Sequence, residues 1–348
     1  MKKIQKITIL ATVLAIMVFI IIYSSDVKQG IVNGLVMCAN ILIPSLFPFT
    51  VLSLFLTNSG LIFYISKPIN TITQLLFKMS GEEFCVFVLS LLGGYPVGAL
   101  LVNQLVENKT MDKDRANKFY LFCFGAGPSF IILAVGEGIL NSKTLGLLIL
   151  TSQIITSTII SFVCLKRNDT IRNHNKLNKQ TDTAQAFIDA TYQGAINIFK
   201  ICIYVVLFSA ITNTTKILFS EYKMLSCLTL PLEITNGVLN ADKNVYLICF
   251  LIGFGGFCIH MQVYSLMNKK IKYAHYFCFR VLHGTISCLI LKILLLLFPQ
   301  SINTISNNVN FGMKVSYISI WSSLALLLMS ICLLYSAKKG GKNEKSVL

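Results

Sequence analysis

Polar side chains lie inside apolar stretches of this chain, close to glycine pairs that would interrupt a membrane helix. The two pairs are Gly93-Gly94 and Gly255-Gly256. The polar residues that follow them are Asn103, Gln104, His260 and Gln262. In a bilayer, an unwound backbone is tolerated only where protein or a water-filled cavity satisfies its N–H and C=O groups. Matched breaks, one in each half of a chain, therefore indicate a transporter-like binding site near the middle of the membrane.

Two carboxylates, Glu137 and Glu233, also lie within apolar segments. A carboxylate in a bilayer is costly unless it is paired, protonated or hydrated. Each follows a proline-containing stretch whose freed backbone groups could help to bind a ligand. Two alternatives stay open: Glu137 would lie in the interface at the outer end of its helix, and Glu233 would lie in an interfacial loop.

Other polar residues have structural alternatives as well. The amide and imidazole groups that follow the glycine pairs could form hydrogen bonds between helices. Arg280 and His283 are expected to extend toward the lipid headgroups, and Tyr204 is expected to pack against neighbouring helices or the membrane interface. The residues that we predict for binding a solute are Gly94, Tyr95, Pro96, Asn103, Glu233, Asn236, His260 and Gln262.

The sequence offers no motif for catalysis or metal binding. Its eleven cysteines fall in apolar stretches, without a Cys-x-x-Cys pair or a Cys/His cluster at zinc spacing. A nucleophile elbow, a P-loop, a His-Glu-x-x-His pair and a dinucleotide fingerprint are all missing from it. We therefore expect a protein that is not an enzyme and that uses no metal and no cofactor.

The elements that carry these residues are expected to be membrane helices. The chain is 55% hydrophobic and only 13% charged, with a mean hydropathy of +0.71, whereas soluble domains carry about 25% charged residues. We predict an all-α polytopic membrane protein with about 9–11 membrane segments, some of them broken or re-entrant. The predicted helices are 7–23, 31–56, 61–77, 84–106, 119–140, 144–165, 194–218, 244–267, 273–298 and 315–335, with a short apolar stretch at 224–240.

Two features of this topology stay open. The stretch 224–240 contains Pro231, Glu233 and Gly237, which favour a re-entrant segment over a full crossing. Segment 61–77 could lie along the interface while 84–106 forms a hairpin, or both could cross the membrane.

The basic residues orient the chain. The formal net charge is +16, and most of the basic residues outside the helices fall at the termini and in loops 107–118, 166–190 and 268–272. This bias follows the positive-inside rule and does not resemble a nucleic-acid-binding patch. We predict a multi-pass protein of the cell membrane with both termini in the cytoplasm, in contact with the lipid bilayer and without a nucleic-acid partner.

The order of the motifs suggests two related halves. Gly93-Gly94 corresponds to Gly255-Gly256, and Leu46-Phe47 corresponds to Leu207-Phe208 at nearly the same offset. We therefore predict a two-fold internal repeat. The predicted divisions are an anchor helix at 1–30, a first half at 31–165, a basic cytoplasmic connector at 166–190, a second half at 191–298, and a final helix with a basic tail at 299–348.

Six motifs resemble those of the sporulation integral membrane protein YlbJ family. They are PSLFPF at 44–49, GYPVGA at 94–99, GPSFI at 127–131, LEITNG at 232–237, GGFCIHMQV at 255–263 and RVLHG at 280–284. The family belongs to the nucleoside-recognition, or Gate domain, group. The resemblance implies a role in endospore formation near cortex assembly, but no known substrate. Gly93 and Cys258 depart from the small polar residue and the serine that are common at these positions.

We expect this protein to move or sense a small polar solute through a Gate-type bundle during formation of the spore cortex. The alternative is a membrane scaffold for assembly of the spore envelope that does not transport. The expected partners are the unknown solute and either further copies of the chain or spore envelope proteins.

Overall fold

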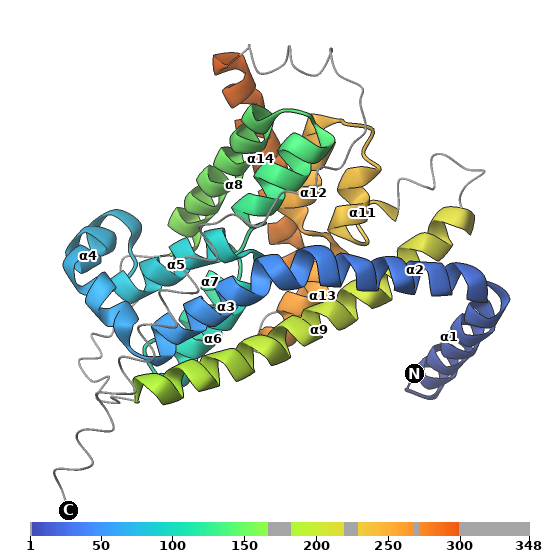
Figure 1. Cartoon of the computed structure of the whole chain (residues 1–348), viewed down its shortest axis with the longest axis horizontal. Helices are drawn as coiled ribbons and strands as arrows, with labels where there is room; N and C mark the ends of the chain where they lie inside the picture. The colour runs from blue at the N-terminus through green and yellow to red at the C-terminus, as the bar shows by residue number, and fades with distance from the viewer. Residues whose placement is uncertain (1, 166–181, 219–228, 268–271, 299–348) are drawn as a thin grey trace, which may run out of the picture.

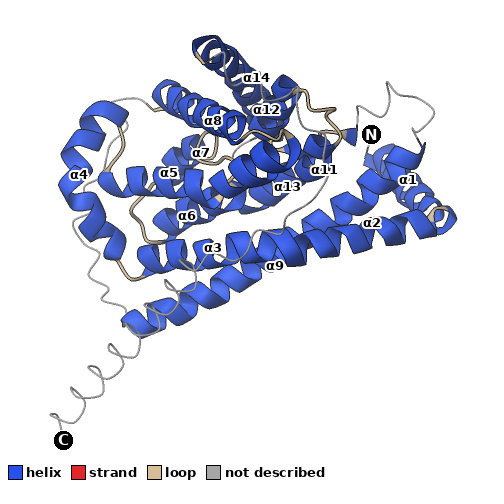
Figure 2. Cartoon of the chain, turned by 45° about the horizontal axis from the view of Figure 1, so that its top comes forward, coloured by secondary structure: helices blue, strands red, loops and turns tan. Residues whose placement is uncertain are grey.

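The computed structural model describes residues 2–165, 182–218, 229–267 and 272–298, and in them the protein consists of helices joined by loops, without a strand (Figure 2). In chain order the elements are α1 (Lys2–Ile22), α2 (Ser24–Met37), the π-helix η1 (Cys38–Leu42), α3 (Ile43–Asn58), α4 (Leu61–Phe77), α5 (Gly81–Gly93), α6 (Tyr95–Glu107), α7 (Lys113–Phe119), the π-helix η2 (Phe130–Ile139), α8 (Lys143–Cys164), α9 (Thr183–Leu218), α11 (Ile234–Leu239), α12 (Val245–Phe254), α13 (Gly256–Leu266) and α14 (Tyr273–Leu297). The predicted helix 315–335, the tail and most of the connector 166–190 lie outside the described residues.

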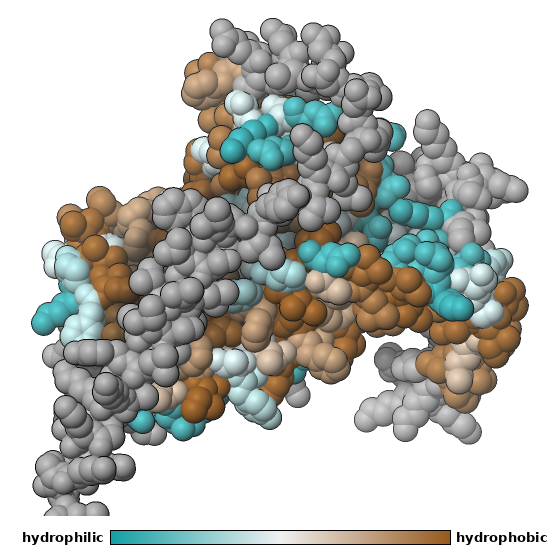
Figure 3. Space-filling model, viewed as in Figure 1, coloured by the Kyte–Doolittle hydropathy of each residue, from teal (hydrophilic) through white to brown (hydrophobic). Residues whose placement is uncertain are grey.

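Five helical stretches in the described part of the chain are long and apolar enough to cross a membrane. They are Ser24–Asn58, Lys143–Cys164, Thr183–Lys216, Val245–Leu266 and Tyr273–Leu297. Large apolar side chains on them, such as Leu35, Ile203 and Leu296, are exposed, and Figure 3 shows apolar residues over the surface along α2 and α9. Such a surface suits contact with lipid tails. The prediction of an all-α polytopic membrane protein is confirmed.

The longest contact joins α2, η1 and α3 to α9, which run side by side (Figure 1). Gly30 and Gly34 allow the backbones to approach closely: a Cβ added at Gly30 would lie 2.6 Å from the Cα of Ala210, and one at Gly34 would lie 2.8 Å from the Cα of Val206. Small residues four positions apart commonly mediate packing between membrane helices. Helix α9 starts earlier than predicted, so the end of the predicted connector 166–190 is helical.

The first glycine pair is the tip of a helical hairpin. Gly94 has a φ of 89°, which L-residues rarely adopt, and the chain reverses there between α5 and α6. The two helices pack so closely that a Cβ added at Gly98 would lie 2.7 Å from the Cβ of Ser90. Each has 13 residues, about 20 Å, which is too short to cross a bilayer. Of the two solutions left open for 84–106, the structure shows the hairpin.

The start of the hairpin is fixed by a capping box and a buried ion pair. Ser80 Oγ accepts a hydrogen bond from the Glu83 N–H at 3.2 Å, and Glu83 Oε2 accepts one from the Ser80 N–H at 2.7 Å. Arg115, which belongs to α7, donates from both Nε and Nη2 to the Glu83 carboxylate. Both side chains are buried. The ion pair therefore joins the start of α5, the end of the hairpin away from its tip at Gly94, to α7.

The predicted helix 119–140 is interrupted. Helix α7 ends at Phe119, residues 124–127 are not helical, and η2 begins at Phe130. The prediction of one continuous helix here was wrong. Pro128 lacks an N–H and disfavours a helical conformation of the residue before it, and Gly125 and Gly127 weaken helix formation further.

The second glycine pair is a kink and not a hairpin. Gly255 has a φ of 90° and separates α12 from α13. Helix α12 packs against α14, whereas α13 packs against α6 and α9 (Figure 1). The internal repeat is therefore not confirmed, because one break reverses the chain and the other redirects it toward a different set of helices.

Candidate functional site

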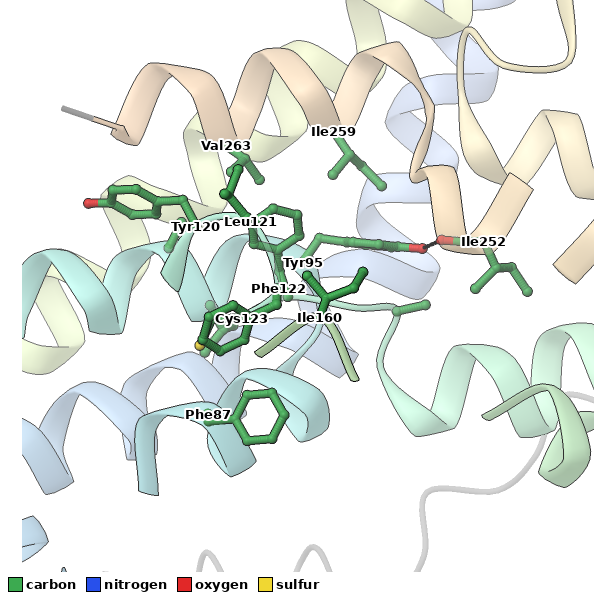
Figure 4. Packing of buried hydrophobic residues seen from close by; sticks show 14 of the residues in the cluster. Phe87, Tyr95, Tyr120, Leu121, Phe122, Cys123, Ile160, Ile252, Ile259 and Val263 are labelled. Carbon is green, nitrogen blue, oxygen red and sulfur yellow. Dashed lines mark hydrogen bonds between the residues drawn. The ribbon is translucent and has the colours of Figure 1, made fainter. Parts of the chain in front are cut away.

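The two breaks meet in the centre of the molecule. Tyr95, the first residue after the hairpin tip, donates a hydrogen bond from Oη to the carbonyl oxygen of Ile252 in α12 at 2.5 Å (Figure 4). A Cβ added at Gly255 would lie 3.5 Å from Cε1 of the same ring. Further along, Asn103 Nδ2 donates to the Leu266 carbonyl at 2.8 Å. These two hydrogen bonds join the start of α6 to α12 and the later part of α6 to the end of α13.

Buried apolar side chains fill the space between these bonds. Ile259 and Val263 of α13 point toward Leu121 and Tyr95, and Phe122 packs beneath them (Figure 4). The segments that follow the two breaks therefore pack against each other through buried apolar side chains. A solute that passes between them would have to separate Tyr95 from α12.

The C-terminal end of α12 is capped by two buried side chains, the cationic Arg280 and the imidazole of His260. Arg280 of α14 donates from Nε to the Phe254 carbonyl at 3.2 Å and from Nη2 to the Gly253 carbonyl. His260 Nε2 also bonds to the Phe254 carbonyl, at 2.8 Å. The terminal carbonyls of a helix carry partial negative charge, so a cation at this end is favourable.

The prediction that Arg280 extends to the headgroups was wrong. Its side chain is only 1% exposed, and its Cζ lies 4.7 Å from the centre of the Phe124 ring. His283 is also buried, where its Nε2 lies 3.0 Å from Ser157 Oγ. The sequence placed both residues near a helix start, but it could not show that the carbonyl end of another helix lies there.

The segment that carries Glu233 satisfies the start of α13. The carbonyl groups of Pro231 and Leu232 accept hydrogen bonds from the N–H groups of Phe257, at 2.7 Å, and Cys258, at 2.9 Å. The first N–H groups of a helix have no partner within the helix. The proline segment therefore provides these partners and fixes the position of the second break.

Glu233 itself caps the short helix α11. Its carboxylate accepts hydrogen bonds from the N–H groups of Thr235, at 3.0 Å, and Asn236, at 2.8 Å. It lies between the long spans α9 and α12 and is 2% exposed. Burial raises the pKa of this carboxyl, and the two N–H donors oppose the rise. Glu233 and Asn236 thus bond to each other at the start of α11, and a role of either in solute binding stays a prediction.

Two other predicted site residues, His260 and Asn103, also bond within the protein, as does Gln104, which follows the first glycine pair. His260 Nδ1 lies 3.3 Å from Tyr273 Oη, and Asn103 Oδ1 accepts a hydrogen bond from Tyr120 Oη. The amide of Gln104 bonds to Asn58 Oδ1 at 2.7 Å. These contacts match the helix-to-helix alternative that the sequence left open. A direct role of Asn103 and His260 in solute binding stays a prediction.

A pocket lies beside the paired breaks, between α6, α9 and α13. Its enclosed space is small, about 10 Å³, which is room for about one water molecule, and the rest of it is open to the surroundings. The residues that line it are Pro96, Leu100, Asn197, Lys200, Ile201, Tyr204, Gln262, Ser265 and Leu266. The structure therefore brings Pro96 and Gln262 of the predicted set to one pocket. Pro96 directly follows Gly94 and Tyr95 in the chain.

The polar groups of this pocket have hydrogen-bonding capacity that the protein does not use. Among the described residues, the side chains of Asn197, Lys200 and Tyr204 form no hydrogen bond or ion pair. The Gln262 amide nitrogen contacts only Cys258 Sγ, at 3.3 Å. Apolar walls with a few convergent polar groups are typical of small-molecule sites. This pocket is a candidate position for a solute in the part of the chain that the structure describes, and a solute would have to widen it.

Sequence reasoning missed most of the α9 side of this pocket. Asn197, Lys200 and Tyr204 lie three and four residues apart, so one helix face presents all three. A signal was available, because Lys200 is a cation inside the apolar run 194–218, and ionisable residues within membrane spans commonly mark functional sites.

The chain is similar to the sporulation integral membrane protein YlbJ of Bacillus subtilis (strain 168). The two sequences are 21% identical over 75% of this chain and 76% of that protein. The resemblance that the six motifs indicated is thereby confirmed. No protein-family model matches the chain. No solved structure matches it significantly.

Proposed function

We propose that this relative of YlbJ is a sporulation membrane protein that moves or senses a small polar solute, and that it is not an enzyme. One observation carries the proposal: residues of both helices that follow the breaks, α6 and α13, line one pocket with α9. The side chains of Asn197, Lys200 and Tyr204 in this pocket have no hydrogen-bond partner among the described residues. A broken helix can change direction at its glycines with little loss of hydrogen bonding. A bound solute could therefore bias the position of α6 relative to α13.

The bundle proposed here is a Gate-type, nucleoside-recognition bundle in the cell membrane with cytoplasmic termini. In such a bundle, the solute would contact the hairpin that contains Gly94 and the helix after Gly255. Gln262 would bind it from α13, and Asn197 would bind it from α9. Arg280, His260 and Glu233 would hold the broken backbone in place. They would act as positioning residues, because their polar groups bond to the protein itself.

Flux through proteoliposomes tests this proposal. The native chain is compared with Gln262→Ala, using a panel of labelled nucleosides, amino acids, sugars and small organic acids. We expect at least one solute to cross faster than in empty vesicles, and Gln262→Ala to reduce that flux about tenfold, the effect of losing hydrogen bonds worth about 1.4 kcal/mol.

Gln185→Ala serves as the matched control, because Gln185 is exposed at the start of α9 and does not line the pocket. Its flux should equal that of the native chain. Fluxes that match empty vesicles for every solute, or that are equal in all three proteins, would contradict transport through this pocket.

The scaffold alternative rests on a separate observation. Asn103, Gln104 and His260 use their polar groups to join helices, as expected of a bundle built for rigidity. Complementation of a spore-forming strain from which the gene is deleted distinguishes the two functions. If the pocket binds a solute, the Gln262→Ala variant should fail to restore sporulation although it is folded and inserted in the membrane. Full restoration would favour the scaffold.

A further inference from the structure

We propose that the solute bound between α6, α9 and α13 is a small organic anion whose charged group is held by Lys200. This inference rests on the proposed function and names the chemical class of its solute. The observation behind it is the position of an unpaired lysine at the edge of a mostly apolar pocket.

Lys200 lies midway along α9, which has 36 residues. It is therefore about 25 Å from either end of the helix at 1.5 Å per residue, and the apolar stretch Thr183–Lys216 surrounds it. An ammonium group within such a span is costly unless it reaches water or a negative partner. The Lys200 side chain is exposed, and it borders the pocket.

The described protein supplies no negative partner for this ammonium group. The nearest acidic residue before it in α9 is Asp189, three turns away, and no described carboxylate forms an ion pair with Lys200. By contrast, the buried Arg115 is paired with Glu83. No acidic residue lines the pocket, so a bound anion would meet one positive charge and no negative one.

The neighbours of Lys200 can complete the recognition of an anion. Asn197 precedes it by three residues and Tyr204 follows it by four, so both lie on the same face of α9. The Asn197 amide and the Tyr204 hydroxyl can each donate a hydrogen bond to an oxyanion. Gln262 faces them across the pocket from α13. Phosphate and carboxylate groups accept several such bonds at once, and charge-assisted bonds are the strongest.

Thermal unfolding of the full-length chain in an uncharged detergent tests the inference. The probes are inorganic phosphate and acetate, each titrated against chloride at constant ionic strength. We expect phosphate, acetate or both to raise the unfolding temperature of the native chain in a saturable way. Lys200→Gln should weaken the apparent affinity by about tenfold or more, because it removes the only charge among the described residues that line the pocket.

Two further variants separate charge from structure. Lys200→Arg keeps the positive charge and should bind the anion within about threefold of the native chain. Lys292→Gln removes an exposed charge from α14, outside the pocket, and should leave the affinity unchanged. No saturable effect in the native chain, or an equal effect in Lys200→Gln, would overturn the inference.

An anionic group could also come from a lipid, so the same variants are titrated with phosphatidylglycerol in mixed micelles. Stabilisation by this lipid alone, dependent on Lys200, would overturn the assignment to a soluble solute. The inference and the proposed function can fail separately. If an uncharged solute shows flux that depends on Gln262 and not on Lys200, the proposed transport is supported and the anion inference is wrong.

Discussion

Gly98→Ala is expected to unfold or open the hairpin of α5 and α6, with a loss of about 3 kcal/mol or more in stability. A Cβ at this position would overlap the backbone carbonyl oxygen of Cys123 and would lie 2.7 Å from the Cβ of Ser90. A backbone carbonyl cannot move aside as the end of a flexible side chain can. Loss of the hairpin should also remove Tyr95 and Pro96 from the site.

Thermal unfolding in detergent measures this loss, with limited proteolysis of the hairpin as a second readout. Gly125→Ala is the matched control, because a Cβ there meets no atom within 4 Å. We expect Gly125→Ala to unfold close to the native temperature. A Gly98→Ala protein as stable as this control would show that α6 does not pack against Cys123 as described.

Glu83→Ala is expected to cost about 3–5 kcal/mol, because it leaves the Arg115 guanidinium buried without its carboxylate. The substitution removes the ion pair with Arg115 and the acceptor for the Ser80 N–H. The start of α5 would then be held to α7 mainly by apolar contacts. Unfolding in a denaturant series gives the change in free energy.

The control for this variant is Glu82→Ala on the same turn of α5. Glu82 is half-buried and forms no ion pair among the described residues, so its removal should cost well under about 1 kcal/mol. Equal effects of the two substitutions would mean that the pairing of Glu83 with Arg115 does not stabilise the hairpin. The double variant Glu83→Ala with Arg115→Met should recover part of the loss, since no charge is then left unpaired.

Local features of the fold could be predicted from the sequence. The apolar runs near α1, α8 and α14 have the length of a membrane helix, and their predicted limits lie within a few residues of the observed ones in α8 and α14. The breaks at Gly94 and Gly255 were also foreseen, because a glycine pair weakens a helix wherever it occurs. The direction of the chain after each glycine depends on tertiary packing, so hairpin and kink could not be distinguished beforehand.

The candidate site was predictable only in part. Pro96 and Gln262 were found because they follow the breaks along the chain. Arg280 required knowledge of which helix ends beside it, since its partners, Gly253 and Phe254, lie in another helix. Lys200 was visible as a charge in an apolar run, but its connection to Gln262 depends on how α9 packs against α13. Contacts between helices that are distant in the chain cannot be predicted from the spacing of residues within one helix.

The proposed function requires that the pocket between α6, α9 and α13 contains water. Cysteine labelling tests this requirement, and it does not need the solute to be known. Asn197→Cys in the pocket is compared with Ile203→Cys on the exposed apolar side of the same helix, in membranes treated with a water-soluble, membrane-impermeant thiol reagent. Labelling of the native cysteines is subtracted. Thiols react as thiolates, which need water, so we expect Asn197→Cys to react at least about tenfold faster. Equal rates at the two positions would contradict the pocket and the function proposed for it.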